Sequence, residues 1–344
     1  MRTSWRAETP TAASADTSSL RLALPVLAGA AAAYVLWRFA TDASPVPPRV
    51  VLGALPLYLA LWLTTVVLHA FRWQMILRRL GTDVPLARLT RLWLAARAVG
   101  AVVPSGTLGG EPVRVRLLTA SGMTGASAAG AVALDRALEL AGNMIVGPLC
   151  IAGAIALGAG PGTAMGITAV GALVGLLVLG LVYVRGMHGR PALVPLLGPL
   201  LPLLPRRWKD PLVQHTVRAD AALRETLAAH PGLVPTGIGV SLAIEALHLF
   251  ELAALFAVFA LAVPLPLLLL SSMGIGIAHA VPVTAALGTL EATQIGLFAI
   301  GGEPLATGLG VAVALRLAET FWILAGLACL AFAPGWHTQR DRAG

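Results

Sequence analysis

The sequence has 344 residues, of which 57% are hydrophobic and only 12% are charged, whereas a soluble domain carries about 25% charged residues. A soluble core of this size cannot use so much apolar surface, so most of it must face lipid. The net charge of +8 comes almost entirely from arginine, since Lys209 is the only lysine. On a membrane protein this excess indicates cytoplasmic loops beside anionic lipids and argues against nucleic-acid binding.

The chain begins with a polar segment of 20 residues, which we expect to form a disordered cytoplasmic N-terminus. Six apolar stretches that are long enough to cross a bilayer follow at about 21–40, 51–71, 124–150, 163–185, 234–262 and 306–333. The first resembles a signal-peptide core, but Glu8 and Asp16 precede it and more spans follow, so we interpret it as a retained helix. We expect one membrane domain over 21–333, with a cytoplasmic loop at about 186–232 and a cytoplasmic tail at 334–344.

Two further apolar stretches, at about 90–118 and 266–302, are interrupted by glycine and proline. The interrupting residues are Pro104, Gly109, Gly110 and Pro112 in the first stretch and Gly274, Gly276, Pro282 and Gly288 in the second. Irregular backbone is tolerated at membrane depth only where protein or a cavity covers it. We therefore predict two re-entrant helical hairpins, and an all-α polytopic membrane protein with six transmembrane helices.

The arginines fall on one side of this arrangement if neither hairpin crosses the membrane. They cluster before the first span, after the second, in the loop after the fourth and at the C-terminus. By the positive-inside rule both termini are then cytoplasmic, in a multi-pass protein of the cytoplasmic membrane. At the end of the second span, His69, Phe71, Arg72 and Trp73 are expected to anchor the helix at the membrane interface.

Several residues recur at an offset of about 180. Arg and Glu stand three residues apart in Arg136/Glu139 and again in Arg316/Glu319, and a glutamate precedes each arginine by 25 residues, at Glu111 and Glu291. The repeats are expected at about 21–150 and 163–333. Each contains three crossings, an odd number, so the second enters the membrane from the opposite side. Inverted repeats of this kind place a binding site near the bilayer midplane and permit alternating access, which favours transport.

An ionised group at the bilayer centre costs roughly 2.5–3.5 kcal/mol on insertion scales, so such groups are functional candidates. The candidate substrate-binding residues are Glu111, Arg114, Arg116, Asp135, Arg136, Glu139, His279, Glu291, Arg316 and Glu319. The Arg/Glu pairs suit either a structural ion pair or a cation that meets a lipid phosphate while the glutamate fixes its pose. Arg114 and Arg116 are either phosphate ligands after Gly109-Gly110 or ordinary cytoplasmic arginines. Glu245, His248 and Glu251 share a helical face and suit a cavity wall or a proton relay.

Other chemistry is excluded by the absence of its motifs. A nucleotide-binding loop of the form G-x-x-x-x-G-K-[ST] is missing, so no ATP-driven motor is expected. No zinc-protease or hydrolase motif occurs, and we expect no metal and no cofactor. Cys150 and Cys329 lie in apolar stretches that end on opposite sides of the membrane, so no disulfide is expected.

The sequence resembles the lysylphosphatidylglycerol synthase transmembrane region, also called the flippase-like domain. The resemblance rests on His69-x-x-Arg72-Trp73, Leu77-Arg78-x-x-Gly81, Gly109-Gly110-x-x-Val113-Arg114 and Asp135-Arg136, and in the second half on Pro282, Gly288, Glu291 and Arg316. Where members often carry a Gly-Gly pair before the second glutamate, this chain reads Ala285-Ala286-Leu287-Gly288. The soluble aminoacyl-transferase domain of the multiple peptide resistance factor is absent, so the resemblance implies a stand-alone lipid translocase.

Three functions remain open on these grounds. The first is a flippase for a lipid with an anionic, phosphate-bearing head group, of the phospholipid or polyprenyl-phosphate type. The second is an intramembrane transferase that acts on a lipid head group with Glu111 or Glu291 as general base. The third is a small-solute or ion-coupled transporter.

Overall fold

The computed structural model describes residues 51–103, 109–158, 163–191, 228–281 and 283–331, with scattered positions between 195 and 225. Every regular element in these ranges is helical, as the sequence predicts. The elements are η1 (Leu52–Ala54), α2 (Leu55–Arg79), α3 (Leu86–Val102), α4 (Glu111–Thr119), α5 (Gly125–Ala156), α6 (Thr163–Met187), α9 (Leu233–Val258), α10 (Leu265–Ala280), η3 (Thr284–Ala286), α11 (Thr289–Ile300) and α12 (Leu305–Ala331).

Four of the six predicted spans are helices that are long and apolar enough to cross a membrane, namely Leu52–Arg79, Gly125–Ala156, Leu233–Val258 and Leu305–Ala331. The predicted span 163–185 corresponds to α6, which has 25 residues. The predicted span 21–40 lies outside the described residues, as do the N-terminus, the C-terminal tail, most of the predicted loop and the prolines 104 and 282. The protein is therefore a helical membrane protein with several apolar helices.

Local sequence explains where these helices begin and end. Proline stands in the first turn of α2, α4 and α10, where its missing N–H group costs no hydrogen bond. The Thr124 side chain caps α5 by accepting a hydrogen bond from the Ser127 backbone N–H at 3.2 Å. The α2 helix continues to Arg79, two turns beyond the predicted end at residue 71, because its last residues form an amphipathic extension of the span.

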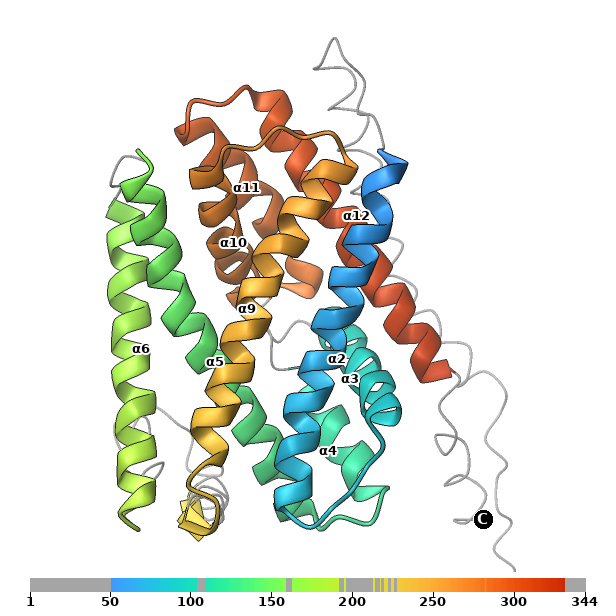
Figure 1. The fold of residues 1–344 in the computed structure, drawn as a ribbon, viewed down its shortest axis with the longest axis vertical. Helices are drawn as coiled ribbons and strands as arrows, with labels where there is room; N and C mark the ends of the chain where they lie inside the picture. Colours follow the sequence, from blue (N-terminus) through green and yellow to red (C-terminus); the bar gives the residue numbers. More distant parts are fainter. Residues whose placement is uncertain are drawn as a thin grey trace, which may run out of the picture.

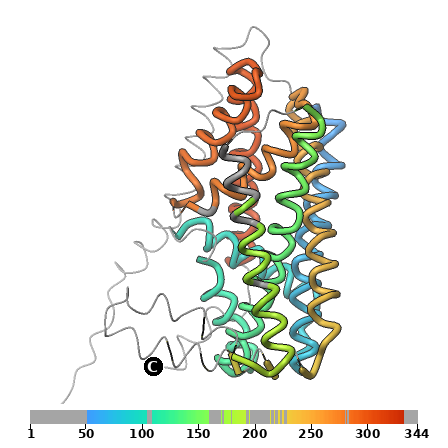
Figure 2. Tube along the Cα trace, turned by 90° about the vertical axis from the view of Figure 1, so that its left-hand side faces the viewer, coloured from blue at the N-terminus to red at the C-terminus, as the bar shows by residue number. Residues whose placement is uncertain are grey.

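The two interrupted stretches fold back on themselves in opposite halves of the molecule. Figure 1 shows α3 and α4 in the lower half and α10 and α11 in the upper half. Figure 2, turned by 90°, shows these two pairs one above the other, beside the layer of long helices. α3 contacts η3, the turn between α10 and α11, so the two pairs meet near the middle of the molecule.

Each helix pair packs against the last long helix of the other half of the sequence. α3 contacts α12 and α10 contacts α5, while α4 and α11 contact the long helices that follow them, α5 and α12. The close approach of α3 and α12 requires Gly326, because a Cβ atom there would collide with the Leu94 carbonyl oxygen. α2 and α9, one from each half of the sequence, run in opposite directions and pack against each other. Helices from both halves of the sequence thus build one interlocked body.

The apolar interior contains three clusters of buried residues. One buried cluster contains residues of α9, α10, α11 and α12, and a second contains residues of α2, α3, α4 and α5. A third, smaller cluster is aromatic and joins α2, α3 and α12 through Trp62, Trp93 and Trp322.

Candidate functional site

A fully buried carboxylate links three helices of the first half. Asp135 on α5 is 0% exposed. Arg72 Nε of α2 donates to one of its oxygens at 2.8 Å, and Arg114 Nη2 of α4 donates to the other at 2.5 Å. The Arg114 guanidinium also lies 4.2 Å from the centre of the Trp73 ring, a geometry that favours a cation. A single carboxylate thereby neutralises two buried arginines only in part.

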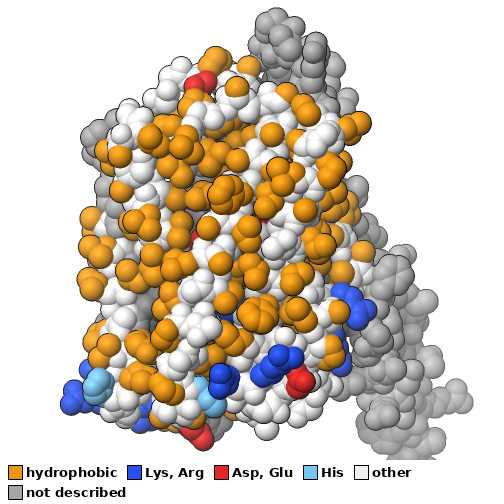
Figure 3. All heavy atoms as spheres, viewed as in Figure 1, with side chains coloured by type: hydrophobic (Ala, Val, Ile, Leu, Met, Phe, Trp, Pro, Cys, Tyr) orange, Lys and Arg blue, Asp and Glu red, His pale blue; other side chains and the backbone are white. Residues whose placement is uncertain are grey.

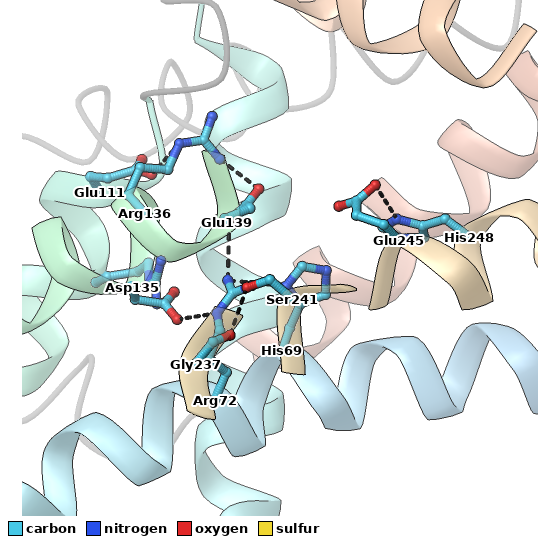
Figure 4. A network of polar contacts seen from close by, with 11 residues as sticks. His69, Arg72, Glu111, Asp135, Arg136, Glu139, Gly237, Ser241, Glu245 and His248 are labelled. Atoms are coloured by element: carbon cyan, nitrogen blue, oxygen red, sulfur yellow. Dashed lines mark hydrogen bonds and ion pairs between the residues drawn. The ribbon is translucent and has the colours of Figure 1, made fainter. Parts of the chain in front are cut away.

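Arg72 is the centre of this network, as Figure 4 shows. Its Nη1 donates to Ser241 Oγ of α9 at 3.0 Å, and its Nη2 donates to Glu139 Oε2 of α5 at 3.4 Å. The Arg72 side chain is completely buried, and His69 beside it is 3% exposed. The predicted interfacial anchor is therefore wrong for His69, Arg72 and the fully buried Trp73, because α2 continues beyond them and places them inside the protein, whereas Phe71 is exposed.

The first repeat also contains a glutamate–arginine–glutamate group that is partly accessible to solvent. Arg136 Nη1 donates to Glu139 Oε1 at 2.6 Å, and Arg136 Nε lies 3.8 Å from Glu111 Oε1. The side chains of Glu111, Arg136 and Glu139, which we call the first triad, are 22%, 15% and 15% exposed.

The second repeat contains the same group 180 positions later, and here the arginine is almost closed to solvent. Arg316 Nη2 lies 2.6 Å from Glu291 Oε1, and Arg316 Nη1 donates to Glu319 Oε2 at 2.5 Å. The side chains of Glu291, Arg316 and Glu319, the second triad, are 11%, 1% and 14% exposed. The repeated spacing in the sequence thus corresponds to repeated contacts in space.

The second triad also holds a turn with an unfavourable backbone. Ala285 and Ala286 have φ angles of 50° and 46°, in the left-handed region that favours glycine. Arg316 Nη1 donates to the Ala285 carbonyl oxygen at 2.7 Å. Gly288, at φ 81°, then allows its N–H to donate to the Glu291 carboxylate at 2.9 Å, where α11 begins. Arg316 and Glu291 thus stabilise a strained turn.

The two halves differ in the charges around their triads. Asp135 and Arg114 of the first half have Leu315 and Gln294 at the positions 180 residues later. Gln294 is fully buried and accepts a hydrogen bond from Ser271 Oγ at 2.6 Å, so a neutral pair replaces the ion pair. The first half therefore carries the larger share of buried charge.

The remaining predicted residues lie at the edges of this network. His279 Nε2 of α10 lies 3.3 Å from Glu319 Oε1, which adds it to the second triad. Arg116 lies exposed on α4, away from the buried carboxylate that Arg114 contacts. His248 and Glu245 of α9 form a separate pair at 3.7 Å (Figure 4), and Glu251, one helical turn beyond His248, is 8% exposed. In the part of the chain that the structure describes, no three His, Cys, Asp or Glu side chains are arranged to hold a metal ion.

Sequence reasoning missed two arginines of this region. Arg72 ends an apolar stretch, which wrongly indicates an interfacial position, and Arg97 of α3 stands in an apolar helix but is not among the candidate residues of the sequence analysis. The signal for Arg97 is its position four residues after Trp93, which places the two side chains on one helical face. In the structure the Arg97 guanidinium lies 5.5 Å from the ring centre of Trp93.

Comparison with known proteins gives the family. No curated protein matches the chain. A family model described as "Lysylphosphatidylglycerol synthase TM region" matches residues 21–327, which include all of the helices described above up to the last turn of α12. The match begins at the predicted first span and extends across both triads. The chain therefore belongs to the lysylphosphatidylglycerol synthase transmembrane region family.

Proposed function

We propose that the protein is a flippase, which moves a lipid with an anionic, phosphate-bearing head group across the cytoplasmic membrane. The observation that carries this proposal is the pair of matching triads, one in each half of the sequence, inside a body whose middle is covered by hydrophobic side chains on the face that Figure 3 shows. A lipid head group needs polar partners along its way, since an unpartnered polar group in hydrocarbon costs several kcal/mol. The chain belongs to a family of membrane proteins whose name refers to a lipid, which agrees with such a role.

The proposal includes a membrane arrangement of six transmembrane helices and two re-entrant hairpins. The hairpins are α3–α4 and α10–α11, which we assign to entry from opposite faces. Figure 3 supports this orientation, since hydrophobic side chains cover the middle of the molecule and arginines gather at its lower end. Exposed arginines at that end include Arg78 and Arg88, near the end of α2 and the start of α3. By the positive-inside rule we assign this end to the cytoplasmic side, and with it the two termini.

The unequal exposure of the triads supports an alternating path. The side chains of the first triad are 15–22% exposed and those of the second are 1–14% exposed, and the two arginines differ most, at 15% for Arg136 and 1% for Arg316. We assign this difference to a state that is open toward the first hairpin and closed toward the second. The head group would move between the hairpins while its acyl or prenyl chains remain in the bilayer, and opening the second triad would complete the transfer.

The proposal predicts that the purified protein moves lipid in vesicles and that this movement depends on Arg136. Proteoliposomes with fluorescent phosphatidylglycerol in both leaflets should lose inner-leaflet signal to an external quencher only when the protein is present. Arg136→Gln should slow this movement about tenfold or more, because a charge-assisted hydrogen bond to the head group contributes about 1.5–3 kcal/mol.

Arg78→Gln is the matched control, since Arg78 forms an exposed ion pair with Asp83 and should leave the rate unchanged. The lipid is recovered afterwards and its mass is measured. Protein-dependent change in that mass would replace the flippase with a transferase, and equal movement in the Arg136→Gln variant would remove the triad from the path.

A further inference from the structure

Arg97 differs from the other arginines near the middle of the bundle. It is exposed on α3, and its guanidinium carbon lies 5.5 Å from the ring centres of both Trp93 and Trp322. Trp93 precedes it by one helical turn, and Trp322 belongs to α12, which packs on α3. Two indole faces therefore fix the position of the cation while leaving its edge accessible.

The hydrogen-bonding capacity of Arg97 is left unused by the residues that the structure describes. Arg72, Arg114, Arg136 and Arg316 each lie within 4 Å of at least one carboxylate. Among the residues that the structure describes, no carboxylate lies within that distance of Arg97. A guanidinium group carries five N–H donors in a planar fork, and contacts with two aromatic faces occupy none of them. The cation is thus held in place and available to an external anion.

Beside Arg97, the ring of Trp93 is followed by two histidine rings, of which His69 is buried and His248 is partly exposed. The His69 ring stacks on Trp93, with ring centres 4.4 Å apart and planes at 21°. The His248 ring lies 5.9 Å from His69. Glu139 and Glu251 lie near enough to Arg97 to interact with its charge, and their negative charges would repel an anion bound there. The charge of Glu139 is already neutralised by its ion pairs with Arg136 and Arg72. The Trp93 and histidine rings thus join the exposed cation to the buried network that contains the first triad.

We propose that Arg97, held between Trp93 and Trp322, is a binding subsite for the phosphate group of a lipid. The planar fork matches two phosphate oxygens, as a bidentate pair. The two indoles present flat apolar surface on which the glycerol and the first methylene groups of a lipid can pack. This inference rests on the proposed function, since it makes the subsite the place where a head group is held before it reaches the first triad.

The test is a titration of the full-length protein with short-chain phosphatidylglycerol. The protein is purified in a neutral detergent, and binding is measured by isothermal titration calorimetry. Arg97→Gln should weaken binding about tenfold or more, since a charge-assisted bond is lost. Arg97→Lys keeps the charge without the fork and should bind with an intermediate affinity. Arg91→Gln, an exposed position on the same helix, is the control and should bind like the wild type. Melting curves of all variants verify that they are folded.

Two parallel probes identify the ligand. Short-chain diacylglycerol, which lacks the phosphate, should bind at least about tenfold more weakly than phosphatidylglycerol. Inorganic phosphate at the same concentration should bind more weakly still, because it lacks the parts that pack on the indoles. Equal affinity of the wild type and the Arg97→Gln variant for phosphatidylglycerol would overturn the subsite. If the wild type bound diacylglycerol or inorganic phosphate as tightly as phosphatidylglycerol, the assignment of the subsite to a lipid phosphate would be overturned.

The binding titration and the flipping assay test the subsite and the proposed function separately. Arg97-dependent binding without lipid movement would keep the subsite and reject the flippase. Lipid movement with unchanged binding by the Arg97→Gln variant would keep the flippase and reject the subsite.

Discussion

Replacing Asp135 with asparagine should destabilise the protein by about 3–5 kcal/mol, the cost of breaking a buried ion pair from one side. Asp135 is 0% exposed and accepts hydrogen bonds from both Arg72 and Arg114. The amide keeps the shape of the side chain but removes its charge, so two buried cations face each other without the counter-charge between them. Glu139, 3.4 Å from Arg72, offsets only part of that loss.

Asp83→Asn is the matched control for this change. Asp83 also pairs with an arginine, Arg78 at 2.9 Å, but the two side chains are 76% and 57% exposed. Surface pairs of this kind contribute little, because solvent screens them. Melting curves of the purified variants in the same detergent measure the difference. Similar melting temperatures for Asp83→Asn and Asp135→Asn would show that the buried network does not hold α2, α4 and α5 together.

Replacing Arg316 with glutamine should also cause a large loss of stability, again about 3–5 kcal/mol. Arg316 is 1% exposed and contacts Glu291, Glu319 and the carbonyl oxygens of Ala285 and Ala286. Without the guanidinium, two neighbouring carboxylates lose their counter-charge. The left-handed turn at Ala285 and Ala286 also loses the donor that holds it. The second hairpin should therefore open at lower temperature than the rest of the protein.

Arg136→Gln, the equivalent change in the first repeat, provides the comparison within the same chain. Its side chain and those of its glutamate partners are 15–22% exposed, so water can solvate the charges that remain. We expect a clearly smaller loss of stability than for Arg316→Gln, measured by thermal unfolding. Equal losses at the two positions would mean that the difference in burial between the triads has no energetic consequence.

The triads could be predicted from the sequence because charged residues stand out in apolar helices. Glu111, Arg136 and Glu139 recur at one offset as Glu291, Arg316 and Glu319, and their contacts recur with them. The spans were predictable for a related reason. Apolar stretches such as Leu233–Val258 are longer than a soluble core needs, so their length alone indicates a membrane helix.

The partners of buried groups could not be predicted in the same way. Arg72 contacts residues of α5 and α9, far away in the sequence, and only the packing of those helices brings them together. The packing of α3 on α12 and of α10 on α5 joins the two halves, and no periodic pattern in the sequence indicates it. Arg97 shows the same limit, since its second aromatic partner, Trp322, lies on the last helix.

The central feature of the proposed path is that the two hairpins enter from opposite faces. Single cysteines at Ala120 and Ile300, in a protein whose Cys150 and Cys329 are replaced by serine, test it most directly. The two positions are 180 residues apart, both are exposed, and they follow α4 and end α11, respectively.

An impermeant thiol reagent is added to sealed vesicles of known orientation, before and after the membrane is opened. We expect Ala120→Cys to react only from the cytoplasmic face and Ile300→Cys only from the opposite face. Labelling of both from the same face would contradict the inverted repeat, and with it the alternating path between the triads.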